Sequence, residues 1–381
     1  MVSLAGDWFS FVAIADLVTE LTGRPGTAAF VYAATVLPVF LASPVAGAIA
    51  DRFDRKRILV ISDLVRVPIA LALCLAGTPL LAIGALVLLG VGASFHDPVA
   101  SAATPNLVAE EDLASAQSLM GAVWGSMLLV GAGVGGLVAE LAGRNTAFVV
   151  DALSFLVSAW LVAGIRAPMQ QARVETREPL RDALSHIRRD ATLRSLIFAK
   201  GGVSWSNGIV GLLPAFAHGR FAGTHVATGL LFAARGLGAL LGPILARIGT
   251  GATPGARAIV VACAVSTLAY GVVYAVFPVA PAFGVALVLV VLAHLGGGAQ
   301  WSLSTYGLQV ATPDHLRGRV MALDYGLATL AIGASSIIAG VLADAFGADS
   351  ATWSLSGVAC VYGIAWLLWS LRILGGAIPR S

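Results

Sequence analysis

Long apolar stretches separated by short polar turns run through almost the whole chain, and they limit its possible folds more than any other feature. A helix needs about 20 apolar residues to cross the hydrocarbon core of a bilayer. Of all residues, 58% are hydrophobic and 11% are charged, whereas a soluble domain is about 45–50% apolar and about 25% charged. The sequence therefore predicts an all-α membrane protein with twelve transmembrane helices, at residues 3–22, 26–50, 58–77, 79–103, 113–142, 145–165, 196–217, 224–247, 257–277, 281–310, 317–345 and 350–371.

One long polar interval, residues 166–195, interrupts this pattern. It divides the chain into an N-terminal six-helix half at 1–165 and a C-terminal six-helix half at 196–381. The interval is short for a regulatory domain, and it contains seven arginines and four acidic residues. It is therefore predicted to be an amphipathic cytoplasmic linker.

The distribution of basic residues predicts the orientation in the membrane. With the N-terminus inside, the cytoplasmic segments carry 17 of the 23 lysines and arginines, and the outer loops carry Arg24, Arg144 and Arg220. Basic residues concentrate in cytoplasmic loops. Both termini are therefore predicted to lie in the cytoplasm.

The two predicted halves contain similar segments at 105–143 and 309–347. Both end in a Gly-x-x-Ala-acidic-x-x-Gly pattern, which places Gly136 on Gly340 and Gly143 on Gly347. Such a match fits a parallel repeat of two helical bundles. Chance similarity between helices rich in Ala, Gly and Leu is the alternative.

The loop between the second and third apolar stretches is densely charged, with four basic and two acidic residues at positions 47–57. Its Gly-x-x-x-Asp-Arg-x-x-Arg-Lys pattern resembles the corresponding loop of major facilitator superfamily transporters, on Gly47, Asp51, Arg52, Arg55 and Lys56. The resemblance implies a conformational gate, in which Asp51 meets the start of helix eleven near Arg317. The alternative is that the loop only sets orientation through its positive charge.

Further motifs narrow the resemblance to the branch of siderophore exporters and macrolide-efflux proteins. They are Gly6-Asp7-Trp8-Phe9, Phe95-His96-Asp97-Pro98 and Leu316-Arg317-Gly318-Arg319. That branch implies a bacterial inner-membrane protein. Met1 stands only five residues before Gly6, which is a shorter lead than in that branch. Either the start is misassigned or helix one is truncated at its N-terminus.

The glycine-rich run from Gly131 to Gly136 imitates a phosphate-binding loop, but it lies inside an apolar stretch with no preceding strand. Close packing of helices through small residues explains it better. It also resembles part of the helix-five motif of drug/proton antiporters, with Val134 near the place of the usual proline. We expect no metal site, no cofactor, no nucleic-acid partner and no enzymatic activity.

Charged side chains inside the stretches are the candidates for proton coupling, because they are costly in lipid and usually face a cavity or a partner. We select Asp7, Asp151, Asp324 and His294. Each has an alternative as an interfacial residue. Asp16 and Asp63 are expected to be interfacial, and Arg66 either extends to the cytoplasmic surface or is buried.

Large aromatic residues are candidates to line a cavity for a hydrophobic substrate. Packing in the core or an interfacial belt is the alternative for each of them: Trp124, Trp205, Trp301, Phe95 and Tyr325.

Together these features predict a monomeric secondary transporter that exports a hydrophobic or amphiphilic small molecule, such as a drug, macrolide or siderophore, in exchange for protons. The proposed mechanism is alternating access. An ion-coupled nutrient importer of the same fold and a non-transporting membrane sensor are the alternatives. The sequence does not identify the substrate or the coupling ion.

Overall fold

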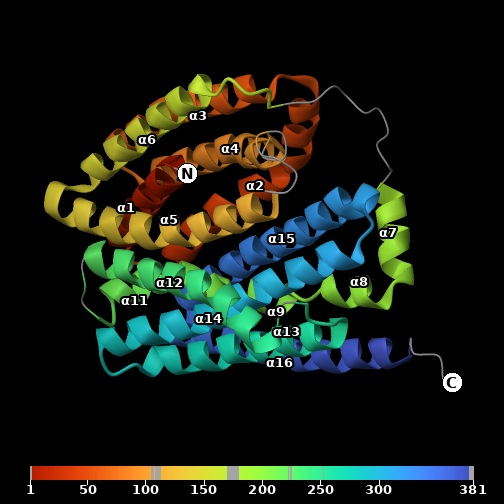
Figure 1. Cartoon of the computed structure of the whole chain (residues 1–381). Coiled ribbons are helices and arrows are strands. Elements are labelled where there is room, and N and C mark those ends of the chain that lie inside the picture. Colours follow the sequence, from red (N-terminus) through yellow and green to blue (C-terminus); the bar gives the residue numbers. More distant parts are fainter. Residues whose placement is uncertain are drawn as a thin grey trace. The chain divides into compact units, whose positions relative to one another are not determined.

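The computed structural model describes residues 2–103, 107, 113–169, 180–221, 223, 225–251 and 253–376. Within these ranges the chain forms helices and no strands (Figure 1). The long helices are α1 (Val2–Thr22), α2 (Thr27–Arg52), α3 (Arg55–Ala72), α4 (Pro79–Ala103), α5 (Leu113–Ala142), α6 (Arg144–Gly164), α12 (His225–Thr250), α13 (Ala256–Val276), α14 (Phe283–Ala311), α15 (Asp314–Phe346) and α16 (Ala348–Gly376).

These eleven helices lie where the sequence predicted them, but the stretch predicted at 196–217 is not one helix. It forms the short helices α8 (Ala191–Leu196), α9 (Gly201–Ser206), α10 (Gly208–Gly211) and α11 (Leu213–His218). Glycine and proline are the residues least favourable to a helix interior. This stretch contains four glycines and a proline within 14 residues, which explains why apolar content alone gave the wrong element.

Ten helices in the described ranges are long and apolar enough to cross a membrane. Many apolar side chains point outward, including Leu75, Leu80 and Leu141 at 84%, 79% and 77% exposure. Exposed apolar surface on this scale is what a bilayer covers. The chain is therefore a multi-pass membrane protein, and twelve crossings remain a prediction.

The chain forms two compact units. The first contains residues 1–173 and 210–236, and the second contains 174–209 and 237–381. In the first unit α1 packs against α5 and α6, α2 against α4, and α3 against α4 and α6. The division at 166–195 into two six-helix halves stays a prediction.

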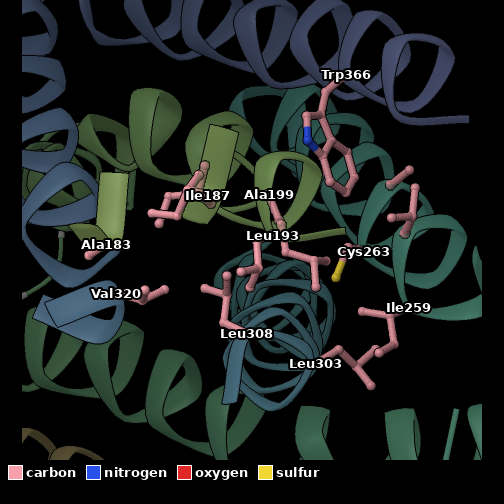
Figure 2. Packing of buried hydrophobic residues seen from close by; sticks show 14 of the residues in the cluster. Ala183, Ile187, Leu193, Ala199, Ile259, Cys263, Leu303, Leu308, Val320 and Trp366 are labelled. Carbon is pink, nitrogen blue, oxygen red and sulfur yellow. The ribbon is translucent and has the colours of Figure 1, made fainter. Parts of the chain in front are cut away.

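In the second unit α13 packs against α14 and α16, and α9 contacts α15 and α16. Figure 2 shows its apolar core, where the short helices contact α13, α14 and α16. Trp366 donates its indole N–H to the carbonyl of Ser195 at 3.0 Å, which ties α16 to α8. The same carbonyl also accepts a hydrogen bond from the Phe198 N–H at 3.3 Å.

The described part of the polar interval includes α7 (Leu180–Arg189), and its end forms most of α8. Ala183 and Ile187 lie one turn apart and are buried in the same core, while Arg181, Arg188 and Arg189 are exposed. This helix is therefore amphipathic, and its place in a cytoplasmic linker stays a prediction.

Close contact between helices depends on the glycines of α5. A methyl group at Gly131 would lie 2.8 Å from the carbonyl oxygen of Ala5, and one at Gly135 would lie 2.9 Å from the Phe9 Cα. Both distances are shorter than a methyl carbon keeps from a non-bonded oxygen or carbon atom. The glycine-rich run therefore packs α5 against α1, as predicted, and does not form a phosphate loop.

Candidate functional site

The Gly6-Asp7-Trp8-Phe9 motif places four neighbouring residues against different partners. A methyl group at Gly6 would lie 2.1 Å from the Ser154 hydroxyl oxygen, so glycine allows α1 to approach α6. Asp7 faces Arg66 of α3, and Trp8 faces Arg235 of α12. Phe9 packs beneath α5.

Arg66 is the centre of a buried charge network in the first unit. Its guanidinium lies 2.5 Å from the Asp63 Oδ1 and 3.6 Å from the Asp7 Oδ2. It also lies 4.3 Å from the centroid of the Phe155 ring. Arg66 is 1% exposed and Asp63 is fully buried. Asp63 and Arg66 are buried because α4 and α6 cover this part of α3. The expected position of Asp63 near the membrane interface stays a prediction.

Asp151 is a third carboxyl group near this network. It is fully buried, and the Ser10 hydroxyl donates a hydrogen bond of 2.5 Å to its Oδ2. The charges of Asp7 and Arg66 both act on it. His96 of α4 lies 3.7 Å from the Asp63 Oδ2. The structure therefore brings Asp7 and Asp151 together, and we define Asp7, Asp63, Arg66, His96 and Asp151 as the acidic cluster.

The other two candidates for proton coupling lie in the second unit and do not meet each other. Asp324 forms a buried ion pair with Lys200, whose ammonium also donates to the Thr305 hydroxyl at 3.0 Å. His294 instead shares a hydrogen bond of 2.9 Å with the Tyr274 hydroxyl, in the interior of the second unit.

The aromatic candidates are also dispersed. Trp301 stacks on Lys200 at 4.9 Å and lies 6.4 Å from Tyr325, so these two border the Lys200–Asp324 pair. Trp124 lies beside Arg235 in the first unit. Phe95 packs on an apolar cluster that includes Ile58, Leu59, Val99, Ala103 and Met169, and the Trp205 carbonyl accepts a hydrogen bond from Ser335.

Part of the gate motif lies outside the described side chains, namely Gly47, Asp51 and Arg52. The Arg55 guanidinium donates to the Met169 carbonyl at 3.2 Å, and the Lys56 ammonium donates to the Ile165 carbonyl at 2.8 Å. Ile165 is the C-cap residue of α6, so Lys56 binds the C-terminus of that helix, where positive charge is favoured. Arg55 binds the segment that follows the helix. The gate itself stays a prediction.

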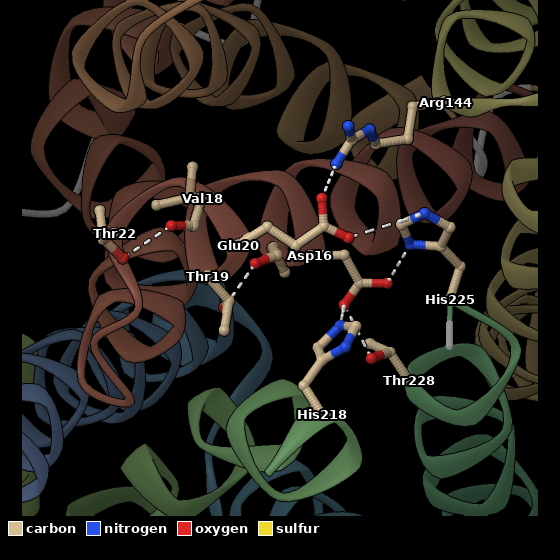
Figure 3. A network of polar contacts seen from close by, with 10 residues as sticks. Asp16, Val18, Thr19, Glu20, Thr22, Arg144, His218, His225 and Thr228 are labelled. Atoms are coloured by element: carbon tan, nitrogen blue, oxygen red, sulfur yellow. Dashed lines mark hydrogen bonds and ion pairs between the residues drawn. The ribbon is translucent and has the colours of Figure 1, made fainter. Parts of the chain in front are cut away.

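Sequence reasoning missed the polar network around Asp16 (Figure 3). Asp16 is fully buried and accepts from the Thr228 hydroxyl at 2.7 Å. Its two oxygens also lie 2.8 Å from the His218 Nε2 and the His225 Nδ1. Asp16 is buried because α11 and α12 cover it, and its expected position near the membrane interface stays a prediction.

This network extends outward through Glu20, which binds Arg144 and lies 4.0 Å from the His225 Nε2. The hydrogen bond with Asp16 raises the pKa of His218 above its ordinary value. Two histidines flanking one predicted turn were the available sequence signal. Their distance in sequence from Asp16 concealed the contact.

Comparison with known proteins agrees with this architecture. Residues 1–374 match the family described as transmembrane secretion effector. The chain is 30% identical to the multidrug efflux pump Tap of Mycolicibacterium fortuitum, over 92% of this chain and 89% of that protein. It is 23% identical to macrolide efflux protein A of Streptococcus pyogenes, over 89% and 86% of the two chains.

Among solved structures, the fold is similar to an inward-facing bacterial homologue of the human lysosomal transporter Spinster. The TM-score is 0.74 at 14% identity, over 100% of this chain and 98% of that one. The family match spans nearly the whole sequence, so the chain belongs to the transmembrane secretion effector family of major facilitator superfamily transporters.

Proposed function

We propose that this transporter exports a hydrophobic or amphiphilic small molecule from the bacterial cytoplasm in exchange for protons. The observation that carries the proton coupling is the acidic cluster, in which Asp63 and Asp7 contact one guanidinium and a third carboxyl group, Asp151, is buried nearby. Unpaired charge is costly in lipid and marks ion or proton pathways.

Charge balance explains why the acidic cluster suits a proton carrier. Arg66 offsets one of the negative charges of Asp7, Asp63 and Asp151, and binding of a proton offsets another. Asp7 is 34% exposed, whereas Asp63 and Asp151 are fully buried. A proton can therefore enter at Asp7 and be shared with the interior. Asp324 and His294 are the remaining candidates.

The substrate class rests on the relatives and on the aromatic side chains. One relative is named a multidrug pump and another a macrolide-efflux protein. Trp124, Trp205 and Tyr325 are each at least 40% exposed although they belong to apolar helices. Together with Trp301 and Phe95, they are the proposed lining for an apolar substrate.

Direction and coupling are tested together in inside-out membrane vesicles with a radiolabelled macrolide and ethidium as probes. An imposed proton gradient, acidic inside, drives accumulation by the parent. Asp7→Asn and Asp151→Asn keep similar size and hydrogen bonding but remove titration. Both variants lose accumulation, whereas Glu140→Gln, at an exposed carboxylate of α5, retains it.

Accumulation by Asp7→Asn and Asp151→Asn under the imposed gradient contradicts coupling through the acidic cluster. Uptake only in right-side-out vesicles contradicts export and indicates an importer.

Alternating access between two six-helix halves is the proposed mechanism, with the Gly47–Lys56 loop as its gate. A carboxylate at a helix N-terminus contributes about 0.3–1 kcal/mol, which shifts a balanced two-state equilibrium severalfold. Asp51→Asn and Gly47→Leu therefore favour the inward-open state. Labelling of single cysteines on the cytoplasmic and outer faces of the protein measures this shift. Unchanged labelling in both variants would mean that the loop only sets the orientation in the membrane.

The protein is proposed to be a monomer in the bacterial inner membrane, with both termini in the cytoplasm. A reporter fused after Arg189 then reads cytoplasmic, and one fused at Gly143 reads periplasmic. The opposite pair of results reverses the orientation.

A further inference from the structure

The first unit contains a buried cation that no described carboxylate neutralises. Arg235 of α12 is 8% exposed, and its Nη2 donates a hydrogen bond of 3.0 Å to the Tyr32 hydroxyl. Its Nη1 is buried and has no hydrogen-bond partner among the described residues. The other basic residues inside the predicted stretches, Arg66 and Lys200, both bind carboxylates.

Three aromatic rings surround the Arg235 guanidinium. Its central carbon lies 5.6 Å from the centroid of the Tyr32 ring, 5.8 Å from that of Trp8 and 5.9 Å from that of Trp124. Such rings stabilise a cation through their negative faces. They provide few acceptors for its N–H groups, so the hydrogen-bonding capacity of the guanidinium is not used up.

A second donor in the same cluster also lacks an acceptor. The Trp8 indole N–H is buried and has no hydrogen-bond partner within the described residues. Buried donors are nearly always paired. An unneutralised guanidinium with one unpaired nitrogen, together with the unpaired indole donor of Trp8, is complementary to an anion with oxygen acceptors.

The apolar side of this cluster suits the rest of an amphiphile. Phe232 of α12 lies 5.0 Å from Phe11 and 5.9 Å from Trp8, measured between ring centroids. Phe11 and Phe232 are buried, at 2% and 0% exposure, whereas Trp124 is 42% exposed. The apolar body of a ligand would therefore contact the Trp124 ring while its acidic group binds the guanidinium.

Glycine packing holds Arg235 in this position. A methyl group at the adjacent Gly236 would lie 2.6 Å from the Leu129 backbone nitrogen and 3.1 Å from the Gly125 carbonyl oxygen. Gly236 therefore presses α12 against α5 within one turn of Trp124. The guanidinium is held by the backbone arrangement as well as by its side-chain contacts.

We propose that Arg235, with Trp8, Tyr32 and Trp124, binds the acidic group of an amphiphilic organic anion, which is one class of substrate of this transporter. The inference rests on the proposed export function but uses residues separate from the acidic cluster. A buried arginine with a purely structural role is the competing explanation, and it makes no distinction between charged and neutral ligands.

Two probes that share an apolar body test the proposal, 9-anthracenecarboxylate and the neutral 9-anthracenemethanol. Binding to the full chain in nanodiscs is measured by energy transfer from tryptophan, with empty nanodiscs subtracted. The parent binds the carboxylate more tightly than the alcohol. Arg235→Gln weakens carboxylate binding at least tenfold and alcohol binding less than twofold.

Matched variants keep the test decisive. Arg247→Gln removes an exposed arginine from the same helix and leaves both affinities unchanged. Trp8→Phe keeps a ring but removes the indole donor, and it weakens only carboxylate binding, by about threefold. If Arg235→Gln does not fold, Trp8→Phe and Arg235→Lys decide the question. The site is supported if Trp8→Phe weakens binding of the carboxylate but not of the alcohol, and if Arg235→Lys still binds the carboxylate more tightly than the alcohol.

Equal affinity of the parent for the two probes overturns the proposal, as does an equal loss for both probes in the Arg235 or Trp8 variants. If equimolar chloride displaces the bound carboxylate but gluconate, the control salt, does not, the claim that the site prefers an organic anion is wrong. Selective binding without export in vesicles would contradict the proposed function alone. Export of ethidium without selective binding would contradict only this inference.

Discussion

The Ser10 hydroxyl lies 2.5 Å from the Asp151 Oδ2, so a serine of α1 donates a hydrogen bond to a fully buried carboxyl group of α6. The Asp151 Oδ1 has no hydrogen-bond partner among the described residues. Ser10 is therefore the main hydrogen-bonding support that the described residues give to this carboxyl group. This bond joins the two helices at the acidic cluster.

Replacing Ser10 with alanine removes that donor and leaves Asp151 buried. Loss of one partner from a buried polar group destabilises a protein by about 1–3 kcal/mol. We expect Ser10→Ala to lower the thermal stability of the purified protein and to alter proton-driven transport. Ser354→Ala is the control, because that exposed hydroxyl bonds only the Ser350 carbonyl of its own helix. Equal stability of the two variants would show that Asp151 does not need Ser10.

Gly6 is predicted to tolerate no side chain. A methyl group there would lie 2.1 Å from the Ser154 Oγ and 2.6 Å from the Asp151 Oδ1. Overpacking of this kind typically costs about 1–3 kcal/mol. Gly6→Ala should therefore unfold at lower temperature than the parent. Gly84→Ala, in α4, meets no atom within 4 Å and should be neutral or stabilising, because alanine favours a helix by about 1 kcal/mol over glycine.

The Lys200–Asp324 pair is predicted to be strongly coupled. Both side chains are 3% exposed, and removing one partner of a buried pair costs about 3–5 kcal/mol. Lys200→Met and Asp324→Asn should each destabilise more than the double variant does. The exposed Arg144–Glu20 pair is the contrast, with about 0–1 kcal/mol expected. Additive losses at Lys200 and Asp324 in a double-mutant cycle would refute the coupling.

His218 should make stability depend on pH. Its hydrogen bond with Asp16 raises its pKa above the ordinary value, which is about 6.5. The protonated form is therefore favoured by folding, and its contribution is fully present below about pH 6.5. It is lost as the pH rises through the higher pKa of the folded state.

We therefore expect the stability advantage of the parent over His218→Gln to be larger at pH 6 than at pH 9, measured by thermal unfolding. Glutamine retains a donor for Asp16 but does not titrate. An advantage that grows with pH would show that His218 is held neutral. The other titratable groups around Asp16 are His225 and Glu20, and they are unchanged in this comparison.

Local sequence was sufficient to predict most of the helices and the family. A helix that crosses a membrane satisfies its own backbone hydrogen bonds, so apolar length alone locates it. Eleven predicted stretches are helices for this reason. The stretch at 196–217 shows the limit, because several glycines and a proline in one apolar segment favour breaks that hydropathy does not register.

Only the tertiary structure decided which charged residues meet. Asp7 and Asp151 are 144 positions apart, and the contact between α1 and α6 brings them to the same cluster. Asp16 and Asp63 resembled interfacial residues in sequence, yet helices distant in the chain cover both. The sequence by itself shows which segments are apolar enough to lie in lipid. The partner of each buried charge depends on how the helices pack, and that packing depends on close contacts at glycines between segments far apart in the chain.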